Sequence, residues 1–114
     1  MDFLEHLPDK QHTMNELHRC LMPGGYLISQ TPSTDGRGAF QDPTHVSFWN
    51  QNAFWYWTRR NLANFIGNQT TRFMVLNLYT NFPNQFCKDN KIAYTTADLV
   101  ALKEGANVPG EKLI

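Results

Sequence analysis

The sequence predicts a small α/β domain, and three observations carry this prediction. An apolar stripe with helical spacing is followed by a Pro-Gly-Gly turn and a short strand at residues 26–30. A long loop and a second helix come next. Residues 72–82 and 92–103 are then rich in residues that favour strands. With 114 residues, the chain is long enough for one domain at most.

The first predicted helix begins at Pro8, because proline suits the first helical position. Gly24 and Gly25 supply the backbone freedom needed to reverse the chain after that helix. Residues 2–6 are interpreted as the exit of a strand, and residues 26–30 as the next strand. The helix buries one stripe of four apolar residues: Met14, Leu17, Cys20 and Leu21.

Residues 33–52 form a long polar loop in this prediction, and its aromatic residues favour an ordered loop over a pocket. The second helix is expected over residues 53–66, with Asn52 as its N-cap and Gly67 at its end. One predicted buried side contains four residues: Trp55, Leu62, Phe65 and Ile66. Phe54 and Trp57 extend the apolar surface, so burial on more than one face is expected.

The two last predicted strands, residues 72–82 and 92–103, carry apolar residues on both alternating faces, which is typical of the interior of a sheet. Residues 83–91 are expected to join them as an antiparallel pair. The predicted domain therefore covers residues 1–103, and residues 104–114 form a tail.

Composition limits the classes of function. Ten basic and ten acidic residues cancel, so no positively charged nucleic-acid footprint or polybasic membrane anchor is indicated. No apolar run approaches the ~20 residues of a membrane-spanning helix. Two cysteines without framework spacing favour a reducing, cytoplasmic location.

Residues 2–32 together with Phe40, Asp42 and His45 resemble the second half of a class I S-adenosylmethionine-dependent methyltransferase. The matching motifs are Asp-Phe-Leu-Glu-His, a helix, Leu-Met-Pro-Gly-Gly, Thr-Pro and Phe-Gln-Asp-Pro-Thr-His. The resemblance implies a partial Rossmann-like sheet, from the fourth strand onward, with an antiparallel last strand. Dimerisation is one way in which such a partial sheet could be completed.

The Gly-rich turn that holds S-adenosylmethionine in this family has no counterpart here, so the chain is expected to be an acceptor-side fragment, inactive alone. The resemblance implies O-methyl transfer to a small molecule or sugar. His45 and His6 are the candidate catalytic residues, and Asp2 is the candidate cofactor-binding residue. Three further residues are candidates for binding the acceptor substrate: Glu5, Phe40 and Asp42.

Glu5, His6 and His45 have two alternative roles. An imidazole can act as a general base near neutral pH. The same three residues are also similar to the acidic and histidine set that binds a divalent ion in some O-methyltransferases, and Mg²⁺, Mn²⁺ or Zn²⁺ would suit them. A third interpretation is purely structural: Glu5 and His6 are polar groups at the end of a strand, and His45 holds its loop in place.

Two other classes of function remain open at this stage. One is a non-catalytic module that forms a homodimer, or docks on a partner, through an exposed sheet edge. The other is a hydrolase using Ser29 or Ser33 with His45 and Asp42, although the sequence has no Gly-x-Ser-x-Gly nucleophile turn.

Overall fold

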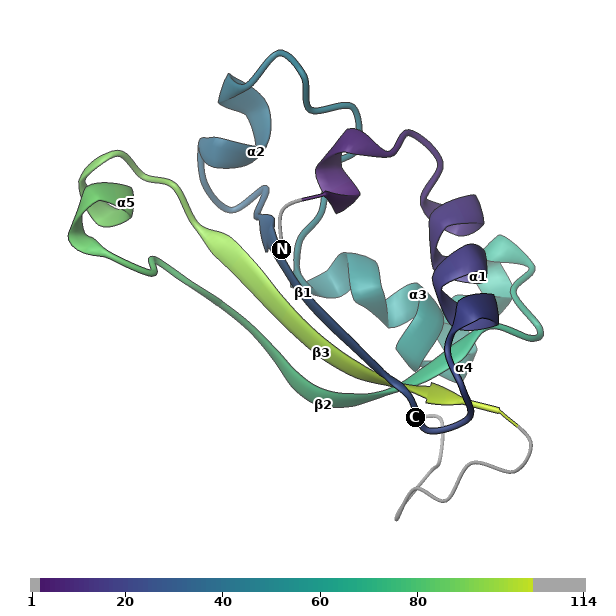
Figure 1. Ribbon diagram of the computed structural model, residues 1–114. Coiled ribbons are helices and arrows are strands. Elements are labelled where there is room, and N and C mark those ends of the chain that lie inside the picture. Colours follow the sequence, from purple (N-terminus) through teal and green to yellow (C-terminus); the bar gives the residue numbers. More distant parts are fainter. Residues whose placement is uncertain (1–2, 104–114) are drawn as a thin grey trace.

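The computed structural model describes residues 3–103, and it shows helices on a three-stranded sheet, which agrees with the α/β prediction (Figure 1). The strands are β1 (Tyr26–Pro32), β2 (Arg72–Asn81) and β3 (Tyr94–Leu102), in the spatial order β1-β3-β2. β3 is antiparallel to both neighbours, so β1 and β2 run in the same direction on its two sides. The predicted antiparallel pairing of the last two strands is confirmed. The tail and Asp2 lie outside the described residues.

The first long helix, α1 (Lys10–Cys20), follows the predicted pattern with small corrections. Asp9, not Pro8, is the boundary residue, because its side chain accepts a hydrogen bond from the His12 N–H at 3.0 Å. Met14 is fully buried, as predicted, but Cys20 is exposed. Leu17 and Leu21, on the same predicted stripe, pack against the core, so Cys20 is the member of the stripe that faces outward.

Gly24 has a φ of 78°, which confirms the predicted reversal before β1. The helices α1, α3 and α4 lie on the same side of the sheet (Figure 1). Between them and the sheet is a core of ten buried residues: Leu4, Met14, Leu27, Trp49, Phe54, Trp57, Phe73, Ala97, Leu99 and Ala101. The strand residues in this list alternate along β3, as expected for one face of a strand.

The predicted loop over residues 33–52 contains a short helix, α2 (Gly38–Gln41), that the sequence analysis missed. The loop packs on the segment before β3: the Ser33 N–H donates to the Ala93 carbonyl at 2.8 Å, and the Arg37 N–H donates to the Lys91 carbonyl at 2.7 Å. The loop is therefore ordered by contacts with residues distant in sequence.

The predicted single helix over residues 53–66 is wrong, because the segment consists of four short pieces. They are η2 (Gln51–Phe54), α3 (Trp55–Thr58), α4 (Arg60–Ala63) and η3 (Asn64–Ile66), where η denotes a 3₁₀ turn. Arg59 is extended, with φ −125° and ψ 128°, and it interrupts the helical path.

The break at Arg59 changes which side chains face the core. Phe54 and Trp57 are buried, whereas Phe65, predicted to be core, is 80% exposed. The burial expected for Phe54 and Trp57 is confirmed and Ile66 packs against the core, but a uniform helical period does not hold across an extended residue, so the prediction for Phe65 is wrong. The cap is Asn50 rather than Asn52, since its side chain accepts from the Ala53 N–H at 3.0 Å. Gly67 ends the segment with a φ of 66°, as predicted.

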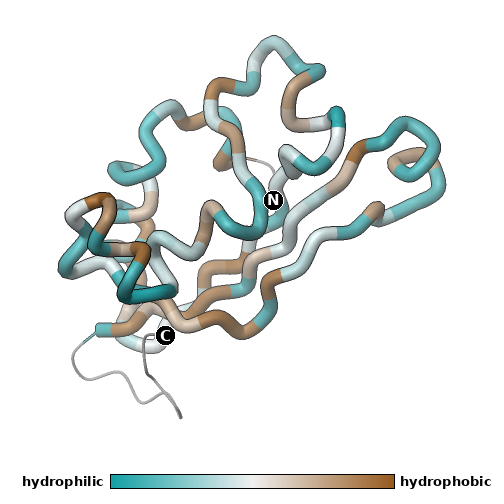
Figure 2. The backbone as a smooth tube through the Cα atoms, turned by 180° about the vertical axis from the view of Figure 1, so that it is seen from behind, coloured by the Kyte–Doolittle hydropathy of each residue, from teal (hydrophilic) through white to brown (hydrophobic). Residues whose placement is uncertain are grey.

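The sheet face away from the helices carries exposed apolar side chains on its two outer strands. Tyr26 and Ile28 of β1 are each 64% exposed, and Tyr79 of β2 is also exposed. Figure 2, which views the chain from behind, shows apolar residues concentrated along the strands and hydrophilic residues in the turn containing α5 (Gln85–Asp89). In the described part of the chain, no helix is long and apolar enough to cross a membrane.

Candidate functional site

The candidate site lies where the end of β1 meets the start of β3. Pro32, the last residue of β1, pairs with Tyr94, the first residue of β3. The 3₁₀ turn η1 (Leu4–His6) and the loop containing α2 cover this end of the sheet. They enclose a pocket of about 230 Å³ lined by nine residues: Glu5, His6, Pro32, Gly38, Gln41, Asp42, His45, Ile92 and Tyr94.

The structure brings Glu5, His6 and His45 together, although His45 is distant in sequence from the other two. One ligand atom from each residue lies within 4.8 Å of the other two. The two imidazole rings meet edge to face, with their centroids 5.0 Å apart. Ligand atoms of a tetrahedral zinc ion lie about 3.4 Å apart, so these three side chains would have to move together by up to about 1.4 Å to share one ion.

Backbone carbonyls fix the direction of both imidazoles. Nδ1 of His6 lies 3.2 Å from the Thr44 carbonyl oxygen, and Nδ1 of His45 lies 3.2 Å from the Ala39 carbonyl oxygen. A carbonyl only accepts, so Nδ1 must carry the proton in each ring and donate it. In the neutral rings Nε2 is therefore the unprotonated nitrogen, which can bind a metal or accept a proton.

Glu5 is the most unusual residue of the site. It is only 2% exposed, yet its Oε2 has no hydrogen-bond partner among the described residues. Its Oε1 lies 3.5 Å from Nε2 of His6. Burying a carboxylate is costly unless it is paired or coordinates a cation. Glu5 therefore has one carboxylate oxygen without a hydrogen-bond partner next to the two histidines.

Glu5 is held by the loop that carries His45. The N–H groups of Val46 and Ser47 donate to the Glu5 carbonyl oxygen at 2.8 and 3.0 Å. These bonds fix the position of η1 relative to the segment after His45. Backbone contacts, rather than flexible side chains, therefore set how η1 and the segment that carries His45 are oriented.

Asp42 stands at the rim of the pocket, with a side chain 45% exposed. The N–H of Thr44 donates to its Oδ1 at 2.9 Å and the Thr44 hydroxyl donates at 2.7 Å, which together hold the pKa of Asp42 below its ordinary value. His45 and His6 lower this pKa further. Oδ2 lies 3.5 Å from Nε2 of His45, so Asp42 remains charged beside the histidine pair.

The other predicted site residues fall elsewhere. Phe40 does not line the pocket of the histidines; it is 59% exposed and stacks on Phe48, with ring centroids 5.2 Å apart. The hydroxyl of Ser29 donates to the Ala97 carbonyl, and the hydroxyl of Ser33 donates to Asp35. Neither hydroxyl is bonded to His45, so the hydrolase hypothesis has no nucleophile.

Sequence analysis missed Tyr94 and Gln41 as pocket residues. Tyr94 reaches the site because β3 starts opposite the end of β1, and only the strand register reveals this. Gln41 ends α2, whose existence was not predicted. Neither residue carries a motif that would mark it in the sequence.

The donor chemistry of the site fits a divalent cation. Two imidazole nitrogens and one buried carboxylate form a set that suits Zn²⁺ or Mn²⁺. Comparison of the chain with protein-family models, with curated proteins and with solved structures gives no match. The functional argument therefore rests on the residues and on their geometry.

Proposed function

We propose that this chain is the acceptor-side part of an S-adenosylmethionine-dependent methyltransferase, and that Glu5, His6 and His45 bind a divalent cation that holds the acceptor hydroxyl. The observation that carries the metal site is the unpaired carboxylate oxygen of the buried Glu5, beside two imidazoles whose Nδ1 atoms face backbone carbonyls. The methyltransferase assignment draws on the sequence motifs of residues 2–45.

The architecture supports this proposal in two ways. The last strand is antiparallel to its neighbours, as the resemblance requires. The site also lies at the carboxyl end of β1, where ligands bind in open α/β sheets. The half that would bind S-adenosylmethionine is proposed to lie outside these residues.

A bound divalent cation would lower the pKa of an acceptor hydroxyl and fix its orientation. The residues of this chain then have separate roles. Glu5 and the two histidines would hold the cation, and Asp42 at the rim would accept a hydrogen bond from a second hydroxyl of the acceptor. Because methyl transfer needs an in-line approach of oxygen to the methyl carbon, this positioning is the main contribution of the site.

The metal site is tested by titrating the chain with Mn²⁺ and Zn²⁺ in a calorimeter. Wild-type protein is expected to bind one equivalent. Glu5→Gln keeps the size of the side chain but removes its charge, and it is expected to weaken binding by at least about tenfold. Glu16→Gln is the matched control, because Glu16 pairs with Arg19 on the surface of α1.

The outcomes separate clearly. Equal affinity of wild type and Glu5→Gln would reject the proposed ligand set. Loss of binding in both Glu5→Gln and Glu16→Gln would point to general destabilisation instead, which circular dichroism of the two variants would reveal.

The methyltransferase assignment needs a different measurement. The 114-residue chain alone is expected not to bind S-adenosylmethionine, whereas the chain extended by the residues encoded upstream of Met1 is expected to bind it. Calorimetry of both proteins checks this expectation. An extended protein that binds divalent metal but no S-adenosylmethionine would contradict the methyltransferase proposal and leave the metal site standing.

A second candidate function, a non-catalytic association module that forms a homodimer, is favoured by the uncovered apolar side chains of Tyr26 and Ile28 on β1. β1 has one hydrogen-bonded neighbour, β3, in the described sheet, so its other edge is open. Light scattering distinguishes this candidate, since a stable monomer at high concentration would argue against it. Ile28→Lys is expected to abolish association if the face is the interface.

A further inference from the structure

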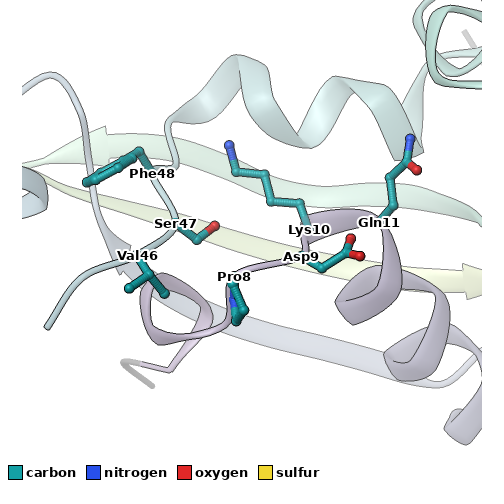
Figure 3. A pocket seen from close by; sticks show the side chains of 7 residues that line it. All are labelled: Pro8, Asp9, Lys10, Gln11, Val46, Ser47 and Phe48. Atoms are coloured by element: carbon teal, nitrogen blue, oxygen red, sulfur yellow. The ribbon is translucent and has the colours of Figure 1, made fainter.

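A second pocket, separate from the histidine site, lies beside the start of α1. It has a volume of about 500 Å³ and is lined by residues 8–11 and 46–48 (Figure 3). This size is within the range of small-molecule sites. It shares no lining residue with the pocket of Glu5, His6 and His45.

Lys10 is the basic residue of this pocket, and Asp9 is the acidic one. Its side chain is half-buried, and its Nζ lies 5.2 Å from the centroid of the Trp49 ring. It forms no ion pair with any carboxylate of residues 3–103, and burial lowers the pKa of its ammonium group. A partly desolvated cation without a counter-ion favours an anion as its neighbour.

Ser47 provides an independent sign that a polar ligand is missing. It is 5% exposed, and its hydroxyl has no hydrogen-bond partner among the described residues. Figure 3 shows this hydroxyl directed toward the Asp9–Lys10 side of the pocket. A buried hydroxyl without a partner is costly, and a small rotation would let it donate to a ligand oxygen in the pocket.

The remaining walls define the shape of the ligand. Asp9 lines the pocket as well, with its Oδ1 accepting the His12 N–H as the cap of α1, so a bound anion has to lie on the Lys10 and Ser47 side of the pocket. The N-terminal end of this eleven-residue helix adds positive potential. Pro8, Val46 and the half-exposed ring of Phe48 are apolar and line the same pocket.

We propose that this pocket binds a small carboxylate with an aromatic body, with Lys10 and Ser47 holding the acid group and Phe48 contacting the ring. This site is independent of the proposed methyltransferase function. The two sites are neighbours, because Val46 and Ser47, which follow His45 in the same loop, donate to the Glu5 carbonyl.

The test is a titration of the isotope-labelled 114-residue chain with benzoate, followed by NMR. Benzoate is expected to shift the amide signals of residues 9–11 and 46–48. Benzamide lacks the charge and inorganic phosphate lacks the ring, so each is expected to bind about tenfold more weakly. If benzamide binds as tightly as benzoate, the role of Lys10 is overturned. If phosphate binds as tightly as benzoate, the role of Phe48 is overturned.

Variants locate the site. Lys10→Met keeps the length of the side chain and is expected to weaken benzoate binding about tenfold, and Ser47→Ala roughly threefold. Lys88→Met on α5 is the control and is expected to bind as wild type does. Unchanged affinity in Lys10→Met, or the absence of shifts in residues 9–11 and 46–48 of the wild type, would overturn the proposal. Lys10→Gln repeats the test if Lys10→Met fails to fold.

Discussion

At the scale of single residues, Gly36 shows how closely the loop after β1 approaches the segment before β3. A Cβ atom built there would lie 2.5 Å from the Ala93 nitrogen and 2.6 Å from the Lys91 carbonyl oxygen. Both neighbours are backbone atoms, which cannot move aside without shifting the loop that carries His45. The absence of a side chain at Gly36 therefore lets the loop that carries His45 pack against the segment before β3.

We expect Gly36→Ala to lower the free energy of unfolding by about 1–3 kcal/mol, because it overpacks a backbone contact. Urea denaturation measures this loss. Gly67→Ala is the comparison: Gly67 has a positive φ but no atom within 4 Å of the added Cβ, so about 1 kcal/mol of backbone strain is the whole cost. A smaller loss for Gly36→Ala than for Gly67→Ala would contradict this account.

His18 gives the fold a dependence on pH. Burial lowers the pKa of His18 below its ordinary value of 6.5, and its Nε2 lies 3.1 Å from the Leu102 carbonyl oxygen. As pH falls through 6.5, the unfolded chain takes up a proton that the folded chain resists, so stability falls with it. Above that pH both states are neutral and this contribution is fully present.

His18→Gln keeps an N–H donor near Leu102 but does not titrate. The loss of unfolding free energy between about pH 7.5 and about pH 5.5 is expected to be smaller in this variant than in wild type. Urea denaturation at both pH values provides the comparison. An identical loss in the two proteins would show that His18 does not contribute.

At the scale of elements, Asn50 joins two parts of the fold. Its Oδ1 caps η2 by accepting the Ala53 N–H, and its Nδ2 donates to the Thr34 hydroxyl at 2.8 Å. Asn50→Ala is expected to cost about 1–2 kcal/mol of stability, measured by urea denaturation. Asn50→Asp keeps the Oδ1 acceptor that caps η2 but loses the Nδ2 donor, so an intermediate loss of stability is expected. A loss equal to that of Asn50→Ala would show that the cap does not stabilise the fold.

Elements with a strong local signal could be predicted from the sequence, and those set by distant contacts could not. The turn at Gly24 and the strands β2 and β3 follow from local backbone preferences and β-forming side chains. The break at Arg59 has no such signal, because neither glycine nor proline stands there. Packing of Phe54 and Trp57 on the sheet overrides the uniform helical period.

Four predicted residues, Glu5, His6, Asp42 and His45, line one pocket, but the rest of the candidate site could not be predicted. Motif positions identified Glu5, His6 and His45, and the fold places them together. The roles of the Thr44 and Ala39 carbonyls in orienting the histidines depend on backbone positions, which a sequence motif does not encode. The same limit applies to Tyr94 and to the exposed stacking of Phe40 on Phe48.

At the scale of the whole molecule, cation binding is expected to stabilise the fold by mass action. A ligand that binds only the folded chain adds about 2.7 kcal/mol of stability at a concentration of about a hundred times its Kd. The thermal midpoint of wild type is therefore expected to rise in Zn²⁺ or Mn²⁺ and to return when a chelator is added. Glu5→Gln is expected to show no rise, and an equal rise in both proteins would place the cation elsewhere.

The central position of β3 has a consequence for biosynthesis. β1 and β2 are translated before β3, and neither pairs with the other in the sheet. A nascent chain on the ribosome therefore holds two unpaired strands until residues 94–102 leave the exit tunnel, and closure then depends on contacts of long sequence separation. During that interval its open strand edges are targets for chaperones and for aggregation.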